Sequence, residues 1–229
     1  MQMGWEQLTF VHWAYDPAEV QRHLPRGLTA QTFDGRAWIS LVPFVMRVQF
    51  PLVGVVPWLS VFPETNVRTY VTAADGTEGI WFFSLDAGRL AAVLAARGGY
   101  RLPYLWSKMT VDVGDERAEY HCERRWPGPR GALSDVSVNI GQQIPPDALD
   151  ERDHFLSARW RLYSAMFGSS WGARAHHEPW TLHRATLDRY DDQLITAAGL
   201  TAPTGDPIVQ YSPGVHVRVS MPYRIRPSV

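Results

Sequence analysis

The segment at residues 37–48, AWISLVPFVMRV, carries large apolar side chains on both faces of an extended chain. Successive side chains of a β-strand point to opposite faces of the sheet. One face of this strand would carry Trp38, Val42, Phe44 and Met46, and the other would carry Ile39, Leu41 and Val45. A strand that is apolar on both faces has to be covered on both sides. The segment therefore predicts a sheet that lies buried between two layers.

Further strand-like runs lie on either side of this segment, and turn dipeptides separate several of them. Asp34-Gly35, Asp75-Gly76 and Gly114-Asp115 are typical of tight connections between antiparallel strands. The strand-like runs are residues 8–13, 28–48, 64–87, 104–113, 116–126, 133–141, 176–188 and 208–222. Such a series predicts an antiparallel, β-rich fold.

Helices are predicted at three places between these strands. Asp16 and Pro17 supply an N-cap and a first-turn proline for a short helix that ends near Leu24. Residues 87–99 are rich in alanine and predict a second helix, and a third is expected after Pro145-Pro146. The apolar stripe of the third helix would consist of Leu149, Phe155, Leu156, Trp160, Tyr163 and Phe167.

Together these patterns predict an α+β, mainly β fold in a single domain that covers residues 1–229. We expect an antiparallel β-barrel or a highly curved sheet, with two or three flanking helices. The chain is long enough to bury a substantial core.

The composition favours a small molecule or a protein as the partner. The formal net charge is −1 and charged residues make up 20% of the sequence, which argues against nucleic acid. No apolar run reaches the roughly 18–20 residues that span a bilayer. Cys122 is the only cysteine, and MQMGWEQLTF at residues 1–10 lacks the order of a secretory signal. We therefore expect a cytoplasmic protein with neither a nucleic-acid nor a membrane partner, and a homo-oligomer is left open.

Lys108 is the only lysine in the sequence, although the chain has 22 basic side chains. Arginine cannot condense with a carbonyl group, whereas a lysine amine can form a Schiff base. A strand at residues 104–113 places Lys108 on the same face as Tyr104 and Trp106, and that face points either to solvent or into a barrel. Lys108 is therefore either a surface side chain or a nucleophilic amine, activated by burial or by a nearby cation such as Arg68.

The remaining motifs predict no metal and no organic cofactor. HHEPW at residues 176–180 puts adjacent histidines on opposite faces of an extended chain, without the ligand spacing of a zinc site. Neither a GxGxxG nor a P-loop sequence occurs, so nucleotide binding is not indicated. Ser212 in YSPG is typical of a turn residue rather than of a hydrolase nucleophile.

Several ordered stretches resemble the YqjF-like family of uncharacterised bacterial proteins. They are LTFVHW, DPAEVQRHLPRGL, FDGRAWISLVPFVMR, FPETNVRTYV, GIWFFSLDA, LPYLWSKM and HHEPW. That family is similar to the acetoacetate-decarboxylase-like superfamily, whose enzymes include decarboxylases and aldolase or dehydratase relatives that act on oxo acids through a lysine Schiff base. The resemblance implies an acetoacetate-decarboxylase-like fold, with LPYLWSKM in the place of the decarboxylase lysine motif.

Two departures from the decarboxylase pattern affect the expected chemistry. Met109 stands where the decarboxylases carry a second lysine, which activates the first. Trp13-Ala14 stands where they carry an arginine after the first strand. Burial or another arginine would therefore have to activate Lys108.

Two functions stay open for this sequence. In the first, Lys108 forms a Schiff base with a small oxo acid or other carbonyl compound, and a lyase reaction of the decarboxylase, aldolase or dehydratase type follows. Glu64 would be its acid or base and Arg68 its carboxylate-binding group, since both lie on one face of a predicted strand. Weaker candidates for substrate binding are Asp86, His12 and Tyr211. In the second function, Lys108 and Arg68 bind a carboxylate or another anion without covalent chemistry. A third possibility, a structural partner subunit, is suggested only by the ten tryptophans.

Overall fold

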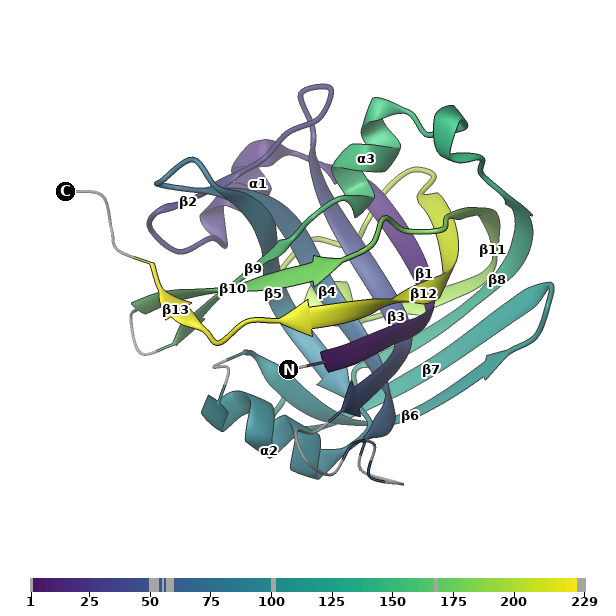
Figure 1. Cartoon of the computed structure of the whole chain (residues 1–229), viewed down its shortest axis with the longest axis horizontal. Coiled ribbons are helices and arrows are strands. Elements are labelled where there is room, and N and C mark those ends of the chain that lie inside the picture. The colour runs from purple at the N-terminus through teal and green to yellow at the C-terminus, as the bar shows by residue number, and fades with distance from the viewer. Residues whose placement is uncertain are drawn as a thin grey trace.

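The computed structural model describes residues 2–49, 54, 56, 60–99, 102–166 and 169–225, and these are mainly β (Figure 1). The strands are β1 (Gln2–Tyr15), β2 (Leu28–Ala30), β3 (Ala37–Gln49), β4 (Val61–Ala73), β5 (Glu78–Ala87), β6 (Tyr104–Val113), β7 (Arg117–Trp126), β8 (Leu133–Gln143), β9 (Arg161–Met166), β10 (Ser169–His177), β11 (His183–Asp192), β12 (Ile208–Val219) and β13 (Tyr223–Arg224). The helices are α1 (Pro17–Arg22), α2 (Leu90–Gly99), α3 (Glu151–Ser157) and α4 (Leu194–Ala197), with a 3-10 turn η1 (Pro146–Ala148).

The strands form one highly curved sheet, and part of this sheet bends into a ring. The pairings run from β12 through β1, β3, β4, β5 and β9 to β10, and β10 pairs with β12 again. Among the described strands, β5 pairs in parallel with β6 and β9, and the other pairings are antiparallel. The predicted fold class, mainly β with a highly curved sheet, is confirmed, although the described residues form four α-helices rather than two or three.

A second layer covers the outer face of part of the ring. β6, β7, β8 and β11 continue the sheet from β5 back to β12 (Figure 1). Ile39 and Leu41 of β3 pack in a core that they share with Tyr120 of β7 and Val136 of β8. On the opposite face of β3, Phe44 belongs to a separate core inside the ring. Both faces of β3 are therefore buried, as its two-sided apolar sequence predicts.

The predicted third helix is shorter than its apolar stripe indicated. α3 begins at a capping box formed by Asp150 and Asp153, and it ends at Ser157. Tyr163 lies in β9, and Phe167 is outside the described residues. Because β9 pairs with both β10 and β5, these long-range strand contacts override the local helical period.

Two of the three predicted tight turns join paired strands. Asp75-Gly76 lies between β4 and β5, and Gly114-Asp115 lies between β6 and β7. At Asp34-Gly35 the local pairing is a single bridge between Phe33 and Arg36. The hairpin predicted there is wrong, because β2 pairs with β4 instead of β3.

The predicted first helix is confirmed. The Asp16 carboxylate caps α1 by accepting a hydrogen bond from the backbone N of Ala18 at 2.7 Å, and Pro17 lies in the first turn. No helix in the described part of the chain is long and apolar enough to cross a bilayer.

A buried ion pair joins the ring to the second layer. Asp86 of β5 and Arg124 of β7 are 0% and 2% exposed. Arg124 donates to both carboxylate oxygens, from Nε to Oδ1 at 2.8 Å and from Nη2 to Oδ2 at 2.7 Å. The Ser107 hydroxyl donates to Oδ1 at 2.7 Å. The Asp86 charge is therefore fully paired, and the pair links the two layers.

Removing one member of this pair should destabilise the fold strongly. We expect Arg124→Met to lower the free energy of unfolding by about 3–5 kcal/mol, because Asp86 would remain buried without a counter-ion. The matched control is Arg125→Met, which breaks a partly exposed ion pair with Glu123 and should cost at most about 1 kcal/mol. Urea denaturation followed by circular dichroism measures both, and equal losses would contradict the structural role of the buried pair.

Candidate functional site

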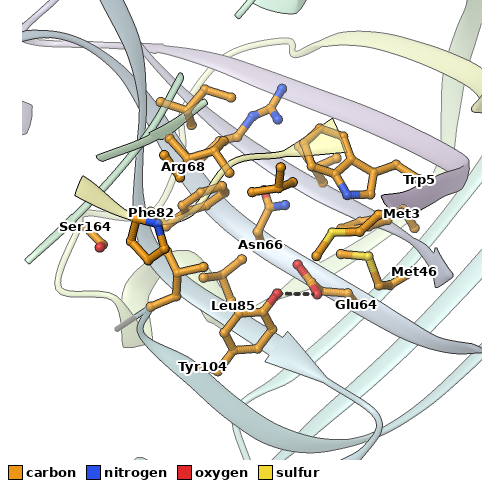
Figure 2. Close-up of a pocket in the computed structure, with 18 of the residues that line it drawn as sticks. Met3, Trp5, Met46, Glu64, Asn66, Arg68, Phe82, Leu85, Tyr104 and Ser164 are labelled. Carbon is orange, nitrogen blue, oxygen red and sulfur yellow. Dashed lines mark hydrogen bonds between the residues drawn. The ribbon is translucent and has the colours of Figure 1, made fainter. Parts of the chain in front are cut away.

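A largely apolar cavity lies inside the ring of strands (Figure 2). Its volume is about 80 Å³, several times the roughly 10–15 Å³ that one water molecule needs. Its apolar wall includes Trp5, Phe44, Met46, Phe82 and Leu85. The polar side chains that line it include Glu64, Asn66, Arg68, Tyr104 and Ser164. An apolar wall with a few convergent polar groups is typical of a site for a small organic molecule.

β4 supplies the polar side of this cavity. Glu64, Asn66 and Arg68 alternate along the strand and share its inner face, as the sequence predicts. They are only 2%, 5% and 5% exposed. The neighbouring strand β3 places Phe44 opposite Glu64 and Val42 opposite Asn66, so the polar row lies against an apolar surface.

Glu64 and Tyr104 form a hydrogen-bonded pair at one side of the cavity. The Tyr104 hydroxyl donates to Oε2 of Glu64 at 2.9 Å. Burial raises the pKa of Glu64 to about 8, the hydrogen bond from Tyr104 opposes that shift, and the charge of Asp86 adds to it. The Glu64 carboxyl is therefore mostly protonated at neutral pH.

Arg68 is a buried cation with no counter-ion among the residues that the structure describes. Its guanidinium lies over the ring of Phe10, with Cζ 5.4 Å from the ring centroid. Among the described residues no carboxylate pairs with Arg68, and its Nε has no hydrogen-bond partner. Glu64 cannot balance the charge while it is protonated. An unpaired buried charge lowers the stability of the fold unless a counter-ion lies beside it.

Two other polar atoms of the cavity are buried without a partner in the described part of the chain. They are the indole Nε1 of Trp5, which is a donor, and the amide Oδ1 of Asn66, which is an acceptor. Buried polar atoms without partners are uncommon in folded proteins. The cavity therefore offers both a donor and an acceptor to a ligand.

Lys108 lies outside this cavity. β6 pairs with β5 only from Tyr104 to Trp106, and beyond that point it runs beside β7. The face that points into the cavity at Tyr104 is exposed at Trp106 and Lys108. A position of Lys108 inside the barrel, one of the two left open by the sequence and the one that a Schiff base in the cavity requires, is therefore wrong, because the strand leaves the ring before it reaches this residue.

The three weaker candidates are buried, but they do not line the cavity. Asp86 is paired with Arg124, and Tyr211 packs in the core between the two layers. His12 lies near Arg68 with Nδ1 2.7 Å from the Ser40 hydroxyl. Burial and then the charge of Arg68 hold the pKa of His12 well below its usual value, so the ring is neutral. Of the predicted site residues, the structure brings Glu64 and Arg68 to one cavity.

Three further cavity residues, Tyr104, Asn66 and Trp5, were not predicted from the sequence as site residues. Tyr104 follows Pro103 in LPYLWSKM, the stretch that resembles the decarboxylase lysine motif. This stretch does reach the cavity, but through Leu102 and Tyr104 rather than through Lys108.

Metal ligands do not gather within the described residues, where no group of three His, Cys, Asp or Glu side chains is placed to hold an ion. His176 is exposed and His177 is buried, so the two point to opposite faces as predicted. The His177 ring packs against Trp5 and Trp180, and its Nδ1 lies 2.6 Å from the carbonyl oxygen of Glu178.

A family model named DUF2071, described as an uncharacterized conserved protein, matches residues 2–216. The chain belongs to this family. It is 32% identical over 213 residues to the protein YqjF of Bacillus subtilis strain 168, which corresponds to 93% of this chain and 87% of YqjF. The family resemblance expected from the ordered motifs is therefore confirmed.

Solved structures show that this family member has an acetoacetate-decarboxylase-like fold. The enduracididine biosynthesis enzyme MppR with bound HEPES has a TM-score of 0.70 and 12% identity, covering 100% of this chain and 88% of MppR. MppR in complex with pyruvate gives a TM-score of 0.67 at 14% identity, covering 99% of this chain and 90% of MppR. An acetoacetate-decarboxylase-like enzyme from Sphingomonas wittichii RW1 gives 0.64 at 13% identity, with coverages of 98% and 92%.

The protonation of Glu64 should make stability depend on pH. Folded Glu64 keeps its proton up to about pH 8, whereas the unfolded side chain releases it near 4.5. The folded state binds more protons between these values, so stability falls as pH rises through this window. We expect Glu64→Gln, which mimics the protonated form, to become more stable than the wild type by a few kcal/mol from pH 5 to pH 8. Urea denaturation at several pH values measures the free energy of unfolding of both proteins. The same pH dependence of this free energy in the two proteins would contradict the raised pKa of Glu64.

Proposed function

We propose that the cavity binds a small organic acid, with the carboxylate of the ligand paired to Arg68. The supporting observation is the buried guanidinium without a counter-ion among the described residues. Guanidinium and carboxylate groups match in geometry and form strong bidentate hydrogen bonds. A bound carboxylate would neutralise the charge of Arg68 and satisfy its donors.

The rest of the cavity indicates that the ligand has a carbon skeleton and a second polar group. Phe82 and Leu85 lie between the polar side chains and offer contacts to methylene groups (Figure 2). The Glu64–Tyr104 pair offers hydrogen bonds to a carbonyl or hydroxyl oxygen. MppR, which shares the fold, has been described in complex with pyruvate, a small oxo acid. An oxo acid of sufficient length has a carboxylate for Arg68 and a carbonyl oxygen for the Glu64–Tyr104 pair.

We favour non-covalent binding over a Schiff base as the basis of this function. A Schiff base needs an amine within reach of the ligand carbonyl. Lys108 is the only lysine in the sequence, and its side chain is exposed outside the cavity. The chemistry that the cavity itself supports therefore depends on a guanidinium, a carboxyl group and a phenol.

Replacing Arg68 separates a functional role from a structural one. We expect Arg68→Met to weaken binding of 4-oxopentanoate, measured by calorimetry, by about 10-fold or more, because the charge-assisted hydrogen bonds are lost. The same change should raise the free energy of unfolding by about 1–3 kcal/mol, since it removes an unpaired buried charge.

The control for this experiment is Arg125→Met, an arginine outside the cavity that should leave binding unchanged. A destabilised Arg68→Met protein with unchanged affinity would show that Arg68 is structural. Failure of the wild type to bind pyruvate, 4-oxopentanoate and 5-oxohexanoate would contradict the proposal.

Borohydride trapping tests the covalent alternative. We expect no mass increase when the protein is reduced in the presence of pyruvate or 4-oxopentanoate, because no lysine lines the cavity among its described residues. Intact mass spectrometry provides the measurement. A trapped adduct that disappears in Lys108→Arg would contradict this expectation and support the hypothesis of a Schiff-base lyase.

A further inference from the structure

We infer that the Glu64–Tyr104 pair exchanges a proton with the carbon next to a ligand carbonyl group, and that the ligands are oxo acids whose carbonyl lies several carbons from the carboxylate. This inference rests on the proposed binding of a carboxylate at Arg68. It adds an activity, reversible enolisation, and a substrate class to that site.

The spacing of the polar groups along β4 sets the length of the ligand. Glu64 and Arg68 are four positions apart on one strand, so their Cα atoms are separated by about 13 Å. Asn66 lies between them on the same face, so the two groups stand at different ends of the polar row. Figure 2 shows the guanidinium of Arg68 and the Glu64–Tyr104 pair on opposite sides of Asn66.

A 2-oxo acid is too short to contact both ends. Its reacting carbon is two C–C bonds of about 1.5 Å from the carboxylate carbon, and each hydrogen bond adds about 2.9 Å. A 4-oxo or 5-oxo acid adds two or three methylene groups between its two polar ends. Phe82 and Leu85 provide apolar surface for these groups.

The proton transfer needs only groups that the cavity contains. The Tyr104 hydroxyl donates a hydrogen bond to Oε2 of Glu64, whereas Oε1 accepts no hydrogen bond from a described residue. In its ionised form, Glu64 would remove a proton from the carbon next to the carbonyl. The C–H electron pair would form a C=C bond, and the carbonyl oxygen would carry the negative charge of the enolate. The indole N–H of Trp5, which is without a partner among the described residues, is a donor for that oxygen. Return of the proton restores the ketone, so the step is balanced and needs no oxidant or reductant.

The surroundings of Glu64 allow its carboxyl group both to accept and to donate a proton. Burial raises the pKa of Glu64 to about 8, close to the pH at which a single group can both accept and donate a proton effectively. The neighbouring groups that affect its ionisation are Tyr104 from β6 and Asp86 from β5, and Asp86 is paired with Arg124. Arg68 lies on the same strand. The exchange rate should therefore rise with pH and level off above about pH 8.

Hydrogen–deuterium exchange in D2O, followed by proton NMR, tests the inference. We expect the wild type to accelerate loss of the proton signal at C5 of 4-oxopentanoate, which lies four C–C bonds from the carboxylate carbon, and to leave pyruvate near its uncatalysed rate. Glu64→Gln should lower the catalysed rate by about 100-fold or more. Arg125→Met, outside the cavity, should exchange at the wild-type rate. Tyr104→Phe removes a hydrogen bond that favours ionised Glu64, so it should move the rise in rate to higher pH.

Binding measured by calorimetry on the same samples separates the two proposals. If 4-oxopentanoate binds without exchange, the inference fails and the proposed binding function stands. If neither 4-oxopentanoate nor 5-oxohexanoate binds, the inference fails, and if pyruvate does not bind either, the proposed binding function fails with it. Exchange of pyruvate alone would overturn the assigned ligand length. Exchange that survives in Glu64→Gln, or that is lost in Lys108→Arg, would overturn the role of the Glu64–Tyr104 pair.

Discussion

β3 and β4 are buried on both faces, and this two-sided burial requires an apolar layer on each side of them. On the outer face the layer is supplied by β7 and β8, whose Tyr120 and Val136 belong to the same core cluster as Ile39. On the inner face it is supplied by the far side of the ring, including Leu162 of β9 and Val217 of β12. The inner core is incompletely filled, and the cavity is the space that remains. The cavity is therefore a consequence of how the sheet bends back on itself.

Polar groups inside such a core lower stability unless they are satisfied, and the protein treats its buried charges in two different ways. Asp86 and Arg124 satisfy each other with two hydrogen bonds, so their pair stabilises the junction of the layers once it is formed. Arg68 has no such partner among the described residues. A residue that lowers the stability of the fold, and that has no structural role, is expected at a functional site. The contrast between the two arginines identifies Arg68 on β4 as the candidate functional residue.

Local periodicity was sufficient to predict that Glu64 and Arg68 share a face, because alternation along a strand does not depend on the rest of the fold. It also grouped Lys108 with Tyr104 correctly. It could not show that this face is inside the ring at Tyr104 and outside it at Lys108, since that depends on a short parallel pairing with β5.

The pairing of Asp86 with Arg124 and the strand conformation of Tyr163 likewise depend on contacts between distant segments. The family resemblance located the relevant stretch, but the bend of β6 decided which side chain enters the cavity.

The charge balance of the cavity explains why a tyrosine suits this position. A lysine ammonium at residue 104 would keep Glu64 ionised and would give the cavity a second cation opposite Arg68. Tyr104 is neutral, because burial and then Glu64 raise the pKa of its phenol well above its usual value. With Glu64 protonated, the described lining carries a single positive charge, on Arg68. One carboxylate on the ligand balances this charge, and the remaining polar groups stay neutral donors and acceptors. The ligand proposed for the cavity, a monoanionic acid whose second polar group is an uncharged carbonyl, would fit this charge balance.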